Sequence, residues 1–108
     1  MKVQQFEGYI IYLGTSAKEN WELLEKAKPH HYFFHLSSFP SGYVILEYTE
    51  RLTETMIRDC AEICKESTKY RNLKKLKVDY CLCSNVIKGE KIGEAMFKSN
   101  RKVNQVTI

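Results

Sequence analysis

The fold of this chain depends on one stretch of sequence, Pro29-His-His-Tyr-Phe-Phe-His-Leu-Ser-Ser-Phe-Pro-Ser-Gly-Tyr-Val-Ile-Leu-Glu-Tyr48. Two runs rich in aromatic and β-branched residues, about 31–36 and 43–48, flank a short polar link that contains Pro40 and Gly42. This composition is typical of a β-hairpin at the centre of a sheet. We therefore expect the hairpin to form the middle of the domain.

Side chains alternate between two faces along a strand. The first run then has one purely apolar face, formed by Tyr32, Phe34 and Leu36. The opposite face carries Phe33 between His31 and His35, whose positions are about 13 Å apart on an extended strand. That separation is too large for one metal ion to bind both imidazoles. His35 is interpreted as a hydrogen-bonded core residue, a polar contact to nucleic acid, or a general base, and these alternatives stay open.

The composition is typical of an ordinary soluble globular chain, which we expect to form one domain over residues 1–108. Hydrophobic residues make up 44% of the sequence and charged residues 28%. No apolar run approaches the roughly 20 residues that a membrane span needs, and the N-terminus shows no secretory signal. We therefore expect a cytoplasmic protein, with a nuclear location as the alternative, and four cysteines that remain thiols.

The net charge of +4 is unevenly distributed. Residues 1–64 carry 6 Lys and Arg against 9 Asp and Glu, whereas residues 65–108 carry 11 against 4. The C-terminal part of the chain is therefore strongly basic. Such segregation indicates a polyanionic partner, with nucleic acid as the first candidate and an acidic membrane surface as the second.

The order of elements predicts an α+β domain. We expect a strand over 9–13, a helix over 16–28 that Ser16 caps and Pro29 ends, a second helix over 53–69, a strand over 76–83 and a C-terminal hairpin. With the central hairpin this is the split β-α-β arrangement with an addition. The second helix should bury a stripe formed by Met56, Cys60, Ile63, Cys64 and Ser67. The expected architecture is a mixed, mainly antiparallel sheet of about 5–6 strands with two helices packed on one face. The other face would then be open for binding.

Two basic clusters are the candidate nucleic-acid contacts. One surrounds the end of the second helix and the strand after it, and the other surrounds the last turns of the chain. The predicted contacts are Lys69, Arg71, Lys74, Lys75, Lys77, Lys88, Lys98, Arg101 and Lys102. A charge run is often only a solvated face, but two clusters in one small domain favour nucleic acid. We expect the two clusters to converge in the fold on one basic face, where phosphates would dock. Phosphate and 2′-OH contacts are favoured over base stacking, because the signature of an RRM sheet is absent.

Short motifs along the chain resemble the NFACT-R family of RNA-binding domains. The family motif Pro-Asp-Asp-x-Trp-x-His, followed by Pro-Gly-Ser-His and a β-branched strand, is similar to this chain at Pro29, His35, Pro40 and residues 44–46. Phe33 stands where the family has Trp, and the two acids of the motif are replaced by histidines.

A second family motif, Gly-Arg-Asn-Ala-Lys-Glu-Asn, is matched at Gly14 and residues 17–20, with Thr15-Ser16 in place of Arg-Asn. The resemblance covers about residues 8–108 and is closest to short members that consist of this domain alone. It implies an RNA-binding module for tRNA or ribosomal RNA, with the ribosome and the quality control of stalled chains as its setting. Lys18, Asn20 and His35 would then orient the RNA near the central hairpin.

Nothing in the sequence indicates catalysis or a cofactor. If Cys60-x-x-x-Cys64 and Cys81-x-Cys83 met in the fold, four thiolates could hold zinc. Neither pair has the usual spacing of a zinc knuckle, however, and a free cysteine is commonly a small buried hydrophobe. Walker, nucleophile-elbow and zinc-protease motifs are absent. We therefore predict a binding module rather than an enzyme. The alternatives are a small RNA-processing enzyme that uses His35, or a basic interaction module for DNA, an acidic protein or a lipid surface.

Overall fold

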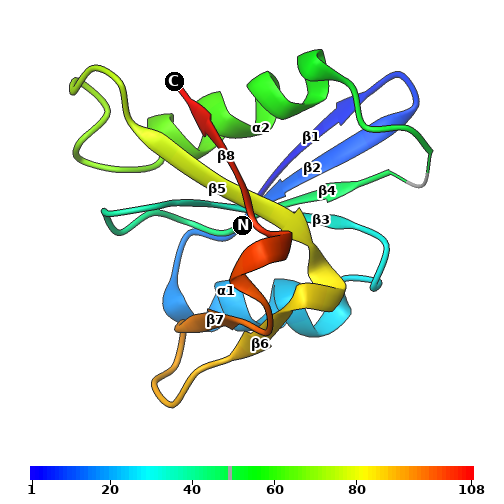
Figure 1. Cartoon of the computed structure of the whole chain (residues 1–108), viewed down its shortest axis with the longest axis vertical. Coiled ribbons are helices and arrows are strands. Elements are labelled where there is room, and N and C mark those ends of the chain that lie inside the picture. The colour runs from blue at the N-terminus through cyan, green and yellow to red at the C-terminus, as the bar shows by residue number, and fades with distance from the viewer. Residues whose placement is uncertain (49) are drawn as a thin grey trace.

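A six-stranded antiparallel sheet in the order β1-β2-β4-β3-β5-β8 forms the centre of the computed structural model, which describes residues 1–48 and 50–108 (Figure 1). Its strands are β1 (Lys2–Phe6), β2 (Tyr9–Leu13), β3 (Tyr32–Leu36), β4 (Val44–Glu47), β5 (Lys77–Leu82) and β8 (Asn104–Thr107). The other elements are the helices α1 (Ala17–Lys26) and α2 (Glu54–Glu66), the paired strands β6 (Val86–Lys88) and β7 (Ala95–Phe97), and the 3-10 turns η1 (Cys83–Asn85) and η2 (Asn100–Lys102). The predicted α+β class and mainly antiparallel sheet are confirmed.

The central hairpin lies in the middle of the sheet, as predicted. β3 pairs with β4 on one side and with β5 on the other. Phe33 and Phe34 are consecutive in β3, yet they are only 1% and 0% exposed. Both faces of the hairpin are therefore buried, which is typical of strands that read as a continuous apolar run.

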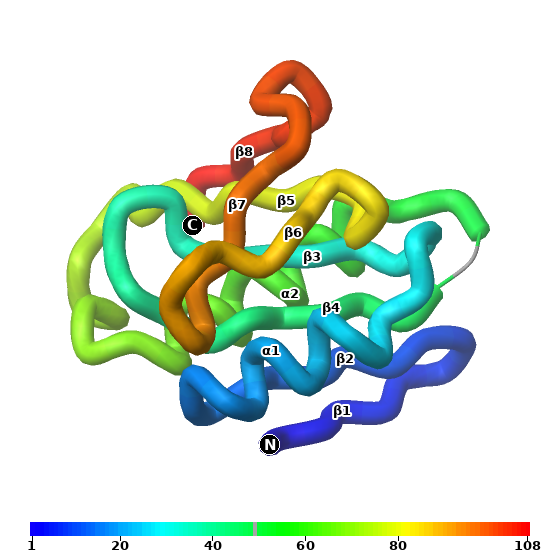
Figure 2. Tube along the Cα trace, turned by 90° about the horizontal axis from the view of Figure 1, so that it is seen from below, coloured from blue at the N-terminus to red at the C-terminus, as the bar shows by residue number. Residues whose placement is uncertain are grey.

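The two helices lie on opposite faces of the sheet, so the prediction that they share one face is wrong. α2 packs Cys60 and Cys64 against Phe34 and Leu46 on one face. On the other face, α1 packs Leu23 into the cluster that contains Phe33, together with the β6–β7 hairpin. Figure 2, seen from below, shows α1, β6 and β7 in front of the sheet. The face that we expected to be open for binding is therefore covered.

The β6–β7 hairpin is fixed to α1 and to the central hairpin by specific hydrogen bonds. The Trp21 indole donates to the carbonyl of Glu94 at 2.9 Å, and the Tyr43 hydroxyl donates to the carbonyl of Gly93. Burial raises the pKa of Tyr43 to about 12, so the hydroxyl keeps its proton near neutral pH. Within the described residues, no helix has both the length and the apolar character that crossing a membrane requires.

The start of α1 confirms the predicted cap. Ser16 Oγ accepts from the Glu19 N–H at 3.2 Å, and the Glu19 carboxylate accepts from the Thr15 N–H at 2.9 Å. The same carboxylate accepts from the Met1 amine at 2.8 Å. The bond from the Met1 amine, followed by those from Thr15, lowers the pKa of Glu19 to about 2. The first turn of α1 is therefore held in place on the side that faces β1.

Candidate nucleic-acid interface

The segment between α2 and β5 carries the larger group of predicted binding residues. We call this group the α2–β5 cluster: Lys69, Arg71, Lys74, Lys75 and Lys77. All of its side chains are exposed, and in the described part of the chain none forms a salt bridge. Leu76 anchors the segment, since it is buried and its backbone exchanges two hydrogen bonds with Ile108 at 3.0 and 2.8 Å. The cluster is thus an exposed cationic surface on a tethered segment that ends at the start of β5.

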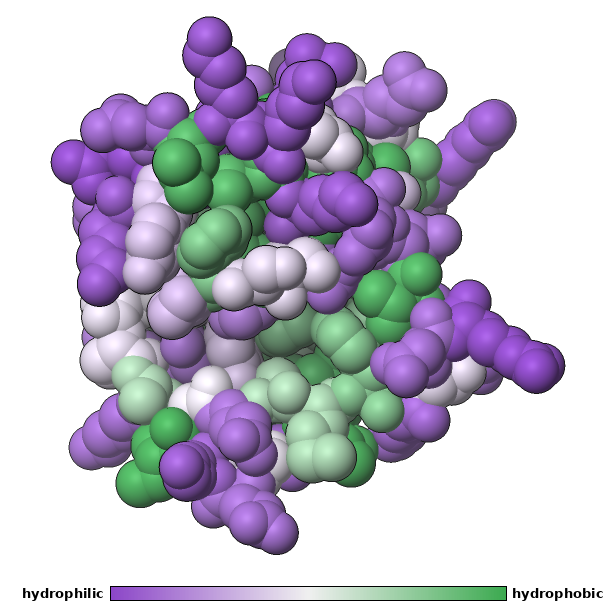
Figure 3. Space-filling view, turned by 60° about the vertical axis from the view of Figure 1, so that its left-hand side comes forward, coloured by the Kyte–Doolittle hydropathy of each residue, from purple (hydrophilic) through white to green (hydrophobic). Residues whose placement is uncertain are grey.

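A cleft of about 630 Å³ separates the start of this segment from the first turn of α1. Lys69 and Lys2 line the cleft together with one acid, Glu66. Lys18 is exposed on the same first turn of α1, where the helix dipole is positive. Figure 3 brings this side forward and shows hydrophilic side chains gathered over its upper part, at the level of α2. Lys2 was not among the binding residues predicted from the sequence, because no strand was expected at residues 2–6.

Asn20 is part of the frame of this cleft. It is 8% exposed, and its Oδ1 accepts from the backbone N–H of Tyr43 at 3.1 Å. A Cβ on Gly14 would lie 2.1 Å from Asn20 Oδ1, and a Cβ on Gly42 would lie 2.2 Å from the Gly14 carbonyl oxygen. Only glycine fits at these two positions. Asn20 therefore holds the first turn of α1 against the central hairpin.

The two histidines of the central hairpin sit near opposite ends of β3. His35 packs against Phe33 and Tyr43, with ring centroids 6.3 and 5.5 Å away. His31 is buried just before β3, and its Nδ1 accepts from the Lys28 N–H at 3.2 Å. Burial lowers the pKa of both side chains. Both imidazoles are therefore neutral at physiological pH, and neither adds a cation to the surface.

Lys88 is not a free cation. Its ammonium group forms a salt bridge with Glu25 on α1 and lies 4.9 Å from the centroid of the Trp21 ring. These contacts compensate its charge and help to fix the β6–β7 hairpin to α1. Lys88 is therefore occupied by contacts within the domain, and we leave it out of the candidate phosphate-binding residues.

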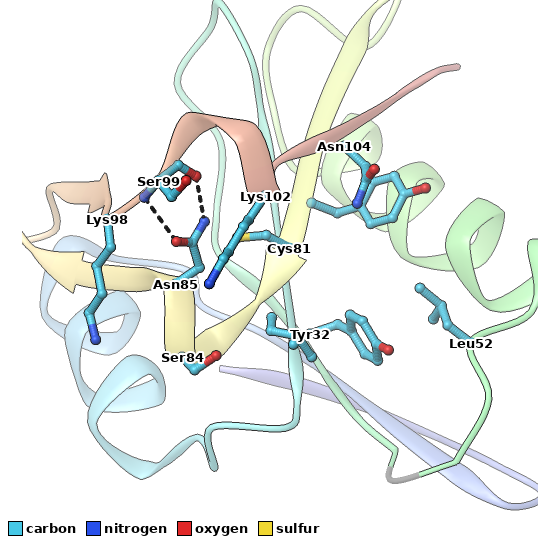
Figure 4. A pocket seen from close by; sticks show the side chains of 11 residues that line it. Tyr32, Leu52, Cys81, Ser84, Asn85, Lys98, Ser99, Lys102 and Asn104 are labelled. Carbon is cyan, nitrogen blue, oxygen red and sulfur yellow. Dashed lines mark hydrogen bonds between the residues drawn. The ribbon is translucent and has the colours of Figure 1, made fainter.

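The second basic group lies around η2, and we call it the η2 cluster: Lys98, Arg101 and Lys102. All three side chains are exposed. The loop that carries them is held by Asn85, whose Nδ2 donates to the Ser99 carbonyl and whose Oδ1 accepts from the Ser99 N–H, both at 2.9 Å (Figure 4). The position of this cluster is therefore set by a buried side chain.

The two clusters lie at opposite ends of β5. The α2–β5 cluster ends at Lys77, the first residue of the strand, whereas Asn85 and the η2 cluster follow its last residue, Leu82 (Figure 1). The six residues of β5 are separated by five steps of about 3.3 Å, which places the two ends about 17 Å apart. The structure thus brings the predicted cations into two groups rather than one patch.

The cysteines form two separate pairs. Cys60 and Cys64 are buried under the sheet face that α2 covers, and Cys81 and Cys83 are buried on the α1 face. The sheet therefore separates the pairs, and four thiols do not meet at one point. Burial raises the pKa of Cys83 to about 12 and that of Cys64 well above its ordinary value. These thiols are protonated near neutral pH and behave as apolar core groups.

The fold and the basic surface define a small α+β domain with two exposed cationic regions on one sheet. The chain belongs to the family of NFACT protein RNA binding domains, whose model matches residues 2–101. The resemblance found in the sequence motifs is thereby confirmed.

Comparison with solved structures gives a similar fold. The C-terminal part of the fibronectin/fibrinogen-binding protein from Streptococcus suis has a TM-score of 0.84 and 22% sequence identity. The match covers 93% of this chain and 41% of that chain, so this protein spans about two fifths of the neighbour. At this identity the likeness shows the fold alone. A search of curated proteins gives no match.

Proposed function

We propose that this domain binds structured RNA, such as tRNA or ribosomal RNA, by docking phosphates on the α2–β5 cluster and the η2 cluster. Membership of an RNA-binding family supports RNA over DNA, an acidic protein or a lipid surface. The observation that carries the proposal is the exposure of eight cations at the two ends of β5, none in a salt bridge among the described residues. Phosphate contacts supply affinity and register without reading sequence.

The spacing of the clusters favours an extended polyanion. A small anion can contact only one end of β5, whereas an RNA backbone can contact both ends, which are about 17 Å apart. Two contacts on one ligand make the second contact intramolecular and raise the overall affinity. The arrangement therefore suits a ligand with phosphates spread along its length.

The predicted orienting residues have different roles in this proposal. Lys18 would contact a phosphate directly, beside the positive end of α1. Asn20 and His35 would act as positioning residues, because their side chains are packed against the central hairpin. The setting that we propose is the ribosome in the cytoplasm, where the domain would serve as an adaptor rather than as an enzyme.

Salt dependence of binding tests the proposal. With about five phosphate contacts, the logarithm of the affinity for tRNA should fall with the logarithm of the salt concentration at a slope near −4 to −5. A fluorescence anisotropy titration with tRNA, duplex RNA and duplex DNA at several salt concentrations measures this slope. A flat response, or equal affinity for an acidic polypeptide, would remove phosphate docking as the mechanism.

A further inference from the structure

A second cleft, of about 600 Å³, lies at the η2 end of β5, beyond the point where β8 stops pairing with β5 (Figure 4). The β5–β8 ladder ends at Tyr80 opposite Asn104. β5 itself continues to Leu82, which is still paired with Tyr32 of β3. The chain before β8 turns away into η2 instead of pairing. The cleft therefore lies between an open strand edge and the η2 cluster.

The open edge presents a backbone donor to this cleft. The Cys83 N–H donates to the His31 carbonyl at 2.7 Å, so it points toward β3. Amide directions alternate along an antiparallel strand, and the Leu82 N–H therefore points away from β3. The Tyr80 N–H points to the same side, but β8 lies opposite it. In the part of the chain that the structure describes, no strand lies opposite Leu82 on this side, and its N–H donates to no other backbone group outside the sheet ladders. This N–H can therefore donate to a ligand.

The side of the cleft away from η2 is aromatic and apolar. Tyr32, Tyr80 and Leu52 line it, and all three are half-buried. The Tyr80 ring is held by stacking on Phe34, with centroids 5.2 Å apart and an angle of 14° between the rings. Among the described residues, neither the Tyr32 hydroxyl nor the Tyr80 hydroxyl has a hydrogen-bond partner. This side offers flat rings already ordered by packing.

The opposite side of the cleft is cationic. Figure 4 shows Lys98 and Lys102 on the side away from Tyr32 and Leu52. No Asp or Glu is found among the residues of the described chain that line this cleft. The backbone of Lys98 is fixed as well, because its N–H donates to the Asn85 carbonyl at 2.8 Å. The cleft therefore combines anion attraction, a backbone donor and apolar rings.

These features match one nucleotide better than a stretch of duplex. A duplex presents phosphates on its outside and keeps its bases stacked inside, so its bases would not reach the rings. An unpaired base has two exposed faces and can stack on an aromatic side chain. Its own phosphate would remain within reach of the cations on the other side.

We propose that this cleft takes one unpaired nucleotide of the RNA, with its phosphate on Lys98 and Lys102 and its base against Tyr32 and Tyr80. The Leu82 N–H and the Asn104 amide would contact the edge of the base. This inference rests on the proposed function, since it names the form of RNA that the domain selects. The α2–β5 cluster would bind the adjoining paired region through phosphates alone.

The test compares two RNAs that differ by one nucleotide: a duplex with a single-nucleotide bulge and the same duplex without it. Stacking of one base changes affinity by about 5- to 150-fold, so we expect the wild-type protein to prefer the bulged duplex by a factor in this range. Tyr32→Leu should lose the preference, whereas Tyr32→Phe, which keeps the ring, should retain it. A 2-aminopurine in the bulge should be quenched by the wild type and by Tyr32→Phe only.

A charge variant at the other end of β5 provides the matched control. Lys74→Gln with Lys75→Gln should weaken binding of both duplexes alike and keep the bulge preference. Equal binding of the two duplexes by the wild type would overturn this inference and leave the proposed function standing. Failure to bind either RNA would overturn both. Tight binding of free uridine monophosphate, without any bulge preference, would assign the cleft to a mononucleotide and also overturn the inference.

Discussion

The two basic clusters are both cationic, but their surroundings differ. The α2–β5 cluster lies on an exposed loop, and the cleft next to it contains an acid, Glu66. The η2 cluster is positioned by Asn85 and borders a cleft with two tyrosines and no acid among the described lining residues. Cations on an open loop can recognise only phosphates, whereas cations beside flat rings can hold a phosphate whose base is also bound. The first region would thus supply affinity and the second selectivity.

Removing Asn85 should give the largest effect, and it should affect only one of the two regions. Asn85→Ala leaves both backbone groups of Ser99 without their partners, and each buried unsatisfied group costs about 1–3 kcal/mol. Because part of this loop is exposed, we expect a loss of about 2–3 kcal/mol in the free energy of unfolding. Urea denaturation measures it, and hydrogen exchange should show faster exchange in residues 98–103.

The control for this variant is Asn72→Ala, in the exposed segment that carries the α2–β5 cluster. It should leave the unfolding free energy unchanged. Asn85→Ala should lose the preference for bulged RNA while duplex affinity stays within a few-fold. Equal loss for both RNAs would mean that the two regions do not have separate roles.

Charge reversal should give the next largest effect, and it acts on the opposite region. In Lys74→Glu with Lys75→Glu, two phosphate contacts worth about 1 kcal/mol each are lost, which corresponds to roughly 30-fold in affinity. The salt slope should become shallower by about 2. Lys26→Glu with Lys28→Glu changes the net charge equally, from exposed positions near the end of α1. If this control pair weakens binding as strongly, only the total charge matters.

The sequence predicted the central hairpin and the helices well, because their signals are local. The predicted cap of α1 at Ser16 is found, and so is most of the predicted stripe on α2, where Met56, Cys60 and Cys64 are buried. Ser67, at the end of that stripe, is exposed. The placement of the helices could not be read in the same way. Phe33 and Phe34 indicate burial on both faces, but periodicity within α1 and α2 does not say which face each helix covers. β1 was missed because most of its side chains are exposed, which leaves little apolar pattern.

The candidate site shows a similar limit. The sequence revealed the basic residues but not their partners. Glu25, which neutralises Lys88, is 63 positions away in the chain. Asn20 was selected by a motif, and only the fold shows that its carbonyl oxygen is occupied by Tyr43. Contacts between residues distant in sequence therefore decide which charged residues remain free.

A smaller effect should come from pH, through the two histidines of the central hairpin. His31 lies toward the η2 end of β3 and His35 toward the α2–β5 end, so each histidine reports on one of the two regions. Burial lowers both pKa values in the folded state, so the unfolded chain takes up protons more readily. The contribution of the two neutral histidines to the free energy of unfolding is fully present above pH 6.5, and it is lost as the pH falls toward their pKa values in the folded state. Each histidine adds at most about 1.4 kcal/mol per pH unit to the slope of the unfolding free energy against pH.

Urea denaturation between pH 5 and 8 measures this dependence. His31→Gln and His35→Gln should each flatten the profile below pH 6.5, whereas Asn72→Ala, at an exposed position without a titratable group, serves as the control. A profile for His31→Gln that matches the wild type would show that the buried imidazole does not couple folding to protons at the η2 end. The same outcome for His35→Gln would exclude coupling at the other end.

The smallest effect is expected at Lys75, where stability and binding should change in opposite directions. Lys75 has a φ of 60°, a conformation that glycine adopts at less cost than other residues. Lys75→Gly should therefore raise the free energy of unfolding by up to about 1 kcal/mol. It should also weaken RNA binding and reduce the salt slope by about 1, because one phosphate contact is lost. Lys74→Gly, at the neighbouring exposed position, should weaken binding without stabilising the fold. A Lys75→Gly variant that gains stability and keeps the full salt slope would remove Lys75 from the α2–β5 cluster as a phosphate contact.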